Sequence, residues 1–140
     1  MTAKELLCSA AGVVGGIIAE LFGGWDLAFV TLITFMAIDY VTGIIVAGVF
    51  HKSKKTESGT LSSHIGWKGI CKKGISMLIV LVACRLDLLI NSNFIRDSTV
   101  SSFIANELIS IIENAGLMEI PIPDGLMQAL DVLKNKDKEN

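Results

Sequence analysis

One carboxylate, Asp39, lies near the centre of a 24-residue run, residues 27–50, that carries no other charge. As a helix this run is about 36 Å long, which is enough to cross the hydrocarbon core of a bilayer. A carboxylate at that depth costs on the order of 3 kcal/mol on insertion scales. It must therefore face partner helices, a water path or a neutralising group. Asp39 is either a cation or proton site, or a protonated or hydrogen-bonded group that only fixes helix packing.

The residues that follow Asp39 make a small, polar stripe on one face of the predicted helix. Thr42 and Gly43 share the face of Asp39, because residues three and four apart are neighbours on a helix. Such a stripe suits a helix interface or a water-lined path. Arg85 or an asparagine from another helix could neutralise Asp39, although Arg85 could instead extend to the outer headgroups.

A second set of polar residues lies on one face of the predicted helix 100–118. A span with this face cannot point it at lipid, so the face must meet other helices or water. The alternative is a helix that lies flat in the headgroup plane with its glutamates in solvent. If the helix spans, these residues are candidates to line a pore: Asn106, Glu107, Ser110, Glu113 and Asn114.

No catalytic motif accompanies these residues. The two histidines, His51 and His64, lie in one polar loop, without a His-Glu-x-x-His, Cys-x-x-Cys, Gly-x-Ser-x-Gly or phosphate-binding loop nearby. The three cysteines lie in or beside apolar runs and form no disulfide framework. We therefore expect no enzymatic activity, no cofactor and no metal site.

The composition predicts an all-α integral membrane protein with one membrane domain, residues 1–140. Hydrophobic residues make up 51% of the chain, charged residues 19%, and the mean hydropathy is +0.60. No strand-like alternation and no nucleic-acid-binding pattern is present. We expect four transmembrane helices, with three as the alternative, a basic cytoplasmic loop at 51–68 and an amphipathic tail at 120–140. The expected helices cover residues 4–22, 26–50, 69–90 and 100–118.

The first predicted helix carries small residues every four positions, with Gly12 and Gly16 in the middle of this face. Such faces allow close helix contacts in membranes. The contact is either with the chain's own neighbouring helices or with a second copy. A cleaved signal peptide is the less favoured reading, because Thr2 and Glu5 form a capping box and Glu20 interrupts the cleavage region.

Basic residues predict the orientation of the chain. If all four helices span, ten lysines lie on the side of the 51–68 loop and two arginines on the other side. This asymmetry places both termini in the cytoplasm. If only three helices span, the split is weaker. We assign headgroup contact and orientation to the basic loop and its flank: Lys52, Lys54, Lys55, Trp67, Lys68, Lys72 and Lys73.

Four motifs in order resemble the phage-lysis and toxin-secretion holin family. They are Asp-Tyr-Val-Thr-Gly at 39–43, Ser-Ser-His-Ile-Gly-Trp-Lys-Gly-Ile-Cys-Lys-Lys at 62–73, the segment 106–116, and Pro-Ile-Pro at 121–123. The resemblance covers roughly residues 25–133. His64 stands where a basic residue is more usual and Glu119 where a small one is common. These departures concern the charge of the loop and the turn before the prolines.

This resemblance implies a small protein that oligomerises in the host cytoplasmic membrane. At a programmed time such proteins form lesions that release the phage endolysin, or export toxins that lack signal peptides, and the endolysin need not be contacted. On this reading Gly12, Gly16, Asp39, Thr42 and Gly43 hold helices together, and the polar face of 100–118 becomes water-exposed on assembly. The alternatives are a small cation or proton channel or transporter that uses Asp39, and an inhibitory partner of a holin.

Overall fold

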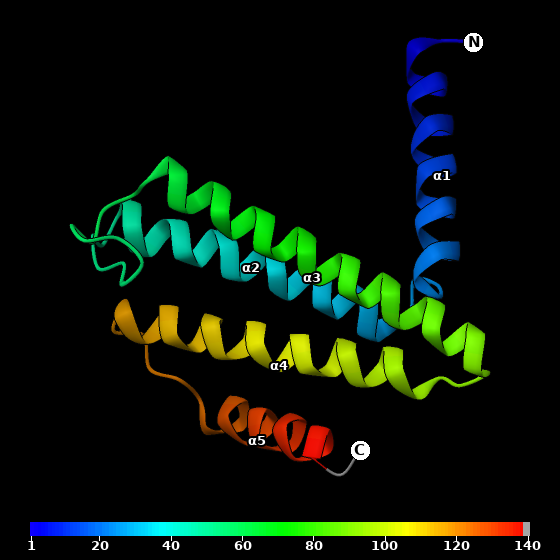
Figure 1. Cartoon of the computed structure of the whole chain (residues 1–140). Coiled ribbons are helices and arrows are strands. Elements are labelled where there is room, and N and C mark those ends of the chain that lie inside the picture. The colour runs from blue at the N-terminus through cyan, green and yellow to red at the C-terminus, as the bar shows by residue number, and fades with distance from the viewer. Residues whose placement is uncertain (139–140) are drawn as a thin grey trace.

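The computed structural model describes residues 1–138, and these residues contain helices and no strand (Figure 1). The all-α class is therefore confirmed. In chain order, the helices are α1 (Ala3–Phe22), α2 (Leu27–Gly48), α3 (Ser63–Ile90), α4 (Phe94–Leu117) and α5 (Asp124–Lys138). The last two residues of the predicted 120–140 tail lie outside the described residues.

Local capping fixes the first two helix boundaries where the sequence places them. The Thr2 backbone N–H donates to Glu5, and the Glu5 backbone N–H donates to the Thr2 hydroxyl at 3.3 Å, which is the predicted capping box. Gly23 ends α1 in the left-handed conformation, with φ 79°. Asp26 begins α2 by accepting a hydrogen bond from the backbone N–H of Phe29 at 2.9 Å.

Two helices begin about six residues earlier than their predicted starts at 69 and 100. For α4 the reason is a contact from another helix: the Asp87 carboxylate on α3 accepts hydrogen bonds from the backbone N–H groups of Ile95 and Arg96, at 3.0 and 2.8 Å. For α3 the extra turns contain Gly66 and Gly69, which disfavour a helix locally. The Tyr40 ring packs against both glycines. The basic loop is correspondingly shorter, residues 49–62.

Helices α2, α3 and α4 lie side by side as an elongated three-helix bundle, and α5 returns along the far side of α4 (Figure 1). The core of the bundle is formed by apolar residues from all three helices, among them Phe29, Leu32, Val80 and Val100, which are fully buried. Leu130 of α5 packs on Ala105 and Leu108 of α4. Helix α4 is thus covered on two sides.

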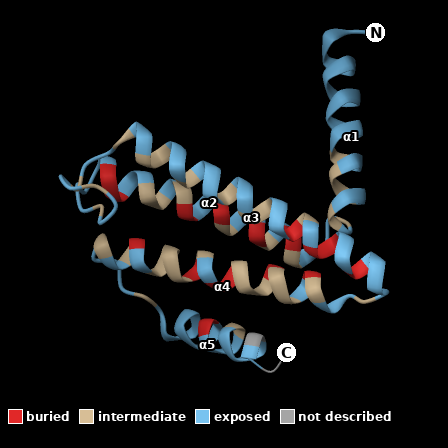
Figure 2. Cartoon of the chain, viewed as in Figure 1, coloured by how far each residue is buried: buried red, intermediate tan, exposed pale blue. Residues whose placement is uncertain are grey.

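Helix α1 projects away from the end of the bundle and contains no buried residue (Figure 2). Its link to the rest of the molecule is made near Phe22 and by the Trp25 indole N–H, which donates to the Gly15 carbonyl at 3.0 Å. Among the described residues, α1 and α2 alone are long and apolar enough to cross a membrane. The composition of α3 and α4 does not identify them as spans.

Candidate functional site

Asp39 lies inside the bundle against a lysine. The Lys73 ammonium on α3 donates to the Asp39 carboxylate on α2 at 2.7 Å and to the Glu107 carboxylate on α4 at 2.5 Å. The three side chains are at most 18% exposed. One cation therefore joins all three helices of the bundle, and it is the neutralising group that the position of Asp39 requires.

Asn114 completes this contact between α2 and α4. Its side-chain amide donates to the Asp39 carboxylate at 3.2 Å and to the Thr42 hydroxyl at 2.9 Å, and it lies 3.3 Å from the Asp39 carbonyl oxygen. Gly43 contacts the same amide from one turn along. We call Asp39, Lys73, Glu107 and Asn114 the Lys73 cluster. An asparagine was one of the two predicted partners of Asp39; the other, Arg85, is exposed on α3.

Charge in the Lys73 cluster is not balanced, because one ammonium faces two carboxylates. Breaking one partner of a buried pair is strongly destabilising, at about 3 kcal/mol or more, since the remaining charge stays desolvated. Ser110 of α4 also lies near Asp39. The arrangement is chemically suited to holding three helices in one register, and loss of the shared ammonium would leave two carboxylates facing each other.

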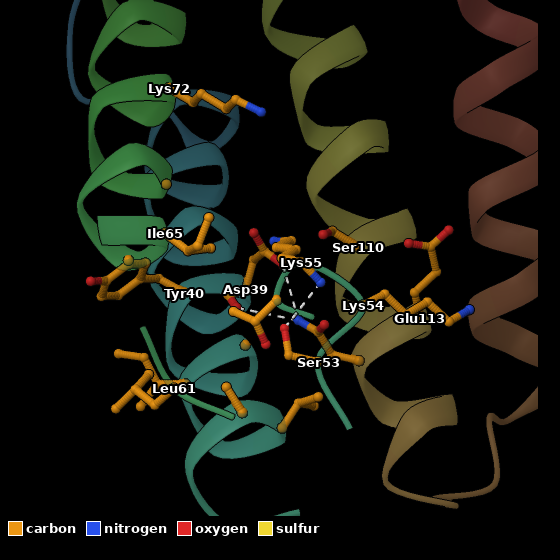
Figure 3. A pocket seen from close by; sticks show the side chains of 18 of the residues that line it. Asp39, Tyr40, Ser53, Lys54, Lys55, Leu61, Ile65, Lys72, Ser110 and Glu113 are labelled. Atoms are coloured by element: carbon orange, nitrogen blue, oxygen red, sulfur yellow. Dashed lines mark hydrogen bonds between the residues drawn. The ribbon is translucent and has the colours of Figure 1, made fainter. Parts of the chain in front are cut away.

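A cavity of about 280 Å³ leads from the Lys73 cluster to the basic loop, between α2, α3 and α4. Lys54 and Lys55 of the loop and Lys72 of α3 line it, with Ser110 and Glu113 of α4 (Figure 3). The polar interior of the bundle is therefore open towards the loop.

A second ionic cluster lies at the opposite end of the bundle. The Arg96 guanidinium on α4 donates to both oxygens of Asp26, at 2.7 and 3.0 Å, and to the Phe22 carbonyl at 2.8 Å. A Cβ added at Gly23 would lie 3.2 Å from the Nε atom of Arg96. The hydrogen bonds from Arg96 hold the pKa of Asp26 below its ordinary value. This Arg96 cluster fixes the junction of α1 and α2 to the start of α4.

Sequence reasoning missed the Arg96 cluster, although a signal for it was present. Asp26 precedes one predicted span and Arg96 precedes another, and the predicted topology places both at the outer boundary. Opposite charges at one end of neighbouring spans are natural partners. The structure brings them together directly.

The structure divides the predicted site residues into those in the Lys73 cluster and those outside it. The Lys73 cluster includes Asp39, Glu107 and Asn114, and Thr42 lies against it. Ser110 is half-buried beside the cluster. The remaining predicted residues are apart: Asn106 and Glu113 are exposed on α4, while Gly12 and Gly16 are exposed on α1 with no atom within 4 Å of an added Cβ.

The predicted headgroup residues also separate. Trp67 and Lys68 are exposed on α3, and Lys52 forms an exposed ion pair with Glu119 at 3.1 Å. Lys54, Lys55 and Lys72 line the cavity. Lys73 lies elsewhere than expected, because its position nearly three turns into α3 directs it between Asp39 and Glu107 rather than to the surface.

The chain belongs to the bacteriophage holin family, whose model matches residues 16–135. It is 40% identical to an uncharacterised protein of Clostridium perfringens, over 94% of this chain and 95% of the relative. It is 34% identical to an uncharacterised protein of Halalkalibacterium halodurans, over 97% and 99%, and 35% identical to one of Listeria monocytogenes, over 90% and 85%. No solved structure matches the chain significantly. The family is not an enzyme family.

Proposed function

We propose that the protein is a holin that oligomerises in the cytoplasmic membrane of a bacterial host and forms lesions at a programmed time. The lesions release an endolysin, or a toxin without a signal peptide, and the host lyses. One observation carries this proposal beyond family membership: Glu107, Ser110 and Asn114 of the polar face of α4 are held inside the bundle in or beside the Lys73 cluster. The chain thus stores a water-tolerant surface inside a molecule whose outside is apolar.

The outer surface of the bundle supports a position in the membrane. Large apolar side chains are exposed along α3, including Ile75, Leu78, Val82 and Leu86, and α2 exposes Ile38 and Val41 in the same way. Soluble monomers rarely expose apolar surface on this scale. Facing lipid, these side chains need no further partner.

Four spans with both termini in the cytoplasm fit the two ionic clusters. The charges that lower the hydropathy of α3 and α4 include Lys73, Glu107 and Arg96, which are paired inside the bundle, and Lys68 and Lys72, which lie at its loop end. Paired charges that face other helices are compatible with a span. Helix α1 is apolar and packs on the bundle near its C-terminal end, through Ile18 and Phe22. In this proposal the rest of it spans the membrane facing lipid.

Assembly requires the closed bundle to open. Separation of α4 from α2 and α3 breaks the Lys73 cluster, and water on the wall of a lesion solvates the freed carboxylates and amide. Opening exposes Glu107, Ser110 and Asn114 beside Asn106 and Glu113, which are already exposed, and so completes the predicted pore face. In this proposal Gly12 and Gly16 of α1 provide a contact between copies, because within the described part of the chain no atom lies within 4 Å of a Cβ added at either glycine.

The cation channel or transporter alternative is less favoured by the site. The place between the two carboxylates where a cation would bind is occupied by the Lys73 ammonium. A selective conductance that Asp39→Asn abolishes, without release of cytoplasmic protein, would support this alternative instead.

Expression together with a cytoplasmic endolysin tests the proposal. A holin causes abrupt lysis that depends on both proteins, and cytoplasmic proteins appear in the medium. An inhibitory partner of a holin causes no lysis in this assay and delays lysis by an active holin. Steady growth with both proteins in the membrane fraction would refute the holin proposal.

A further inference from the structure

The cavity at the loop end of the bundle contains an excess of positive charge that the Lys73 cluster does not use. Lys73 is neutralised by Asp39 and Glu107. The three other lysines that line the cavity, Lys54, Lys55 and Lys72, form no hydrogen bond or ion pair through their ammonium groups within the described residues. Against them stand Glu113 and the surplus carboxylate of the Lys73 cluster, so the lysines that line the cavity exceed its carboxylates by one.

The cavity also has an apolar side. Figure 3 shows Tyr40, Leu61 and Ile65 together on one side of it, and Lys54 and Glu113 on the other. Leu61 is 56% exposed, so this apolar side reaches the surface of the molecule. A cavity with a cationic side and an apolar side that continues to the surface matches an amphiphile with an anionic head.

We propose that this cavity binds the phosphate headgroup of one anionic phospholipid. Lys54, Lys55 and Lys72 bind the phosphate, and the lipid leaves past Leu61 with its glycerol and first acyl carbons against Tyr40 and Ile65. A volume of about 280 Å³ accommodates a headgroup rather than a whole lipid. The proposal rests on the membrane placement proposed above, which puts this end of the bundle at the anionic cytoplasmic surface.

The bound phosphate would lie beside Lys73, which lines the same cavity. The site would therefore place a lipid next to the cluster that holds the bundle closed. The composition of the inner leaflet is then one of the variables that set the stability of the closed bundle.

Lipid binding by the whole protein in nanodiscs tests the site. Nanodiscs of equal parts phosphatidylcholine and phosphatidylglycerol are used, and lipid retained by the protein after release from the disc is identified by native mass spectrometry. We expect one retained phosphatidylglycerol. The variant Lys55→Gln/Lys72→Gln should lower its retention at least about tenfold, because each lysine near a charged lipid surface contributes about 1 kcal/mol.

The matched control is Lys4→Gln/Lys134→Gln, which removes the same charge outside the cavity and should leave retention unchanged. Lys55→Arg/Lys72→Arg should also retain the lipid, and circular dichroism checks the helix content of each variant. Equal loss in the cavity and control variants would overturn the proposal. Competition by free phosphates gives a second contradicting outcome. If inorganic phosphate or glycerol phosphate displaced the lipid at the same concentration as added phosphatidylglycerol, the ligand would be a free phosphate.

The experiment separates this site from the proposed function. Failure of the protein to enter nanodiscs contradicts the membrane placement. Entry into nanodiscs without a preference for phosphatidylglycerol contradicts the lipid site alone.

Discussion

At the scale of single residues, the unequal charges of the Lys73 cluster determine what each substitution does. Removing the cation leaves two carboxylates facing each other in the bundle, whereas removing one carboxylate leaves a balanced pair. The second change is therefore milder than the first. A larger loss of stability on removing Lys73 than on removing one carboxylate therefore distinguishes an ionic cluster from a simple packing contact.

We predict that Lys73→Gln destabilises the bundle by about 3 kcal/mol or more, because two partly buried carboxylates lose their cation. Unfolding of the purified protein in detergent measures the free energy. Adding Glu107→Gln to Lys73→Gln should restore part of the loss, since one of the unpaired charges is removed. Lys68→Gln, on the exposed side of α3, is the control and should have little effect. Additive losses in the double variant would contradict the ionic account.

The Arg96 cluster predicts a pH dependence at the acidic end. The folded pKa of Asp26 is lowered, so its contribution to stability is fully present above the ordinary value of 3.8 and is lost as the pH falls through the lowered value. Asp26 is half-exposed, and the contribution is about 1 kcal/mol or less.

Unfolding of the wild type and of Asp26→Asn at pH values from neutral to strongly acidic measures this contribution. The difference between the two should shrink as the pH falls below 3.8. Glu57→Gln on the exposed loop, which lacks such a partner, should track the wild type throughout. A difference that grows towards acidic pH would show that the sign is wrong.

At the scale of helices, the proposed opening of the bundle depends on α4. It contacts α2 and α3 through Val100, Ile104 and its polar residues, and α5 through Ala105 and Leu108. If α4 spans, α5 cannot stay beside it, because the outer face of α5 carries charged residues such as Asp131 and Lys134, which would meet lipid. Opening of the bundle therefore includes departure of α5 to the headgroup region.

A disulfide between α4 and α5 should block this step. In a variant without the three native cysteines, Leu108→Cys/Leu130→Cys joins two residues that pack together. We predict that cells expressing it with an endolysin, once treated with the thiol oxidant diamide to form the disulfide, lyse only after a reducing agent is added. The single variant Leu130→Cys should lyse without reductant. Lysis of the oxidised double variant at the normal time would show that α5 need not move.

Helix α1 makes a prediction of its own. Gly12→Leu/Gly16→Leu should leave the unfolding free energy of the bundle within about 0.5 kcal/mol, because nothing packs on these glycines within the chain. The same variant should weaken crosslinking between copies in the membrane if the glycines form the contact between them. Undiminished crosslinking would remove α1 from the assembly interface.

The helical class, the capping box of α1 and the need for a partner of Asp39 could be predicted from the sequence, because each depends on nearby residues or on burial in lipid. Lys73 was assigned to the headgroups because its neighbours in sequence are basic. Its real environment comes from α2 and α4, which are more than thirty residues away. The early start of α4 was missed for the same reason, since Asp87 caps it from α3.

At the scale of the whole molecule, the chain combines apolar outer faces on α2 and α3 with a bundle whose two ends are each held by an ionic cluster. The arrangement suits a protein that first dissolves in lipid as a compact unit and later exposes water-tolerant surface in an oligomer. The free helix α1 and the covered helix α4 then have different roles, one in contact between copies and the other in lining the lesion.

Labelling of Ser110→Cys with a membrane-impermeant thiol reagent, before and after lysis is triggered in cells, tests whether the polar residues of α4 become exposed to water on assembly. Native cysteines are removed, and Val82→Cys, on the exposed apolar face of α3, is the lipid-facing control. We predict slow labelling at position 110 in the closed bundle and labelling at least about tenfold faster after triggering. Position 82 should not be labelled in either state. Equal labelling of position 110 before and after lysis would contradict this prediction.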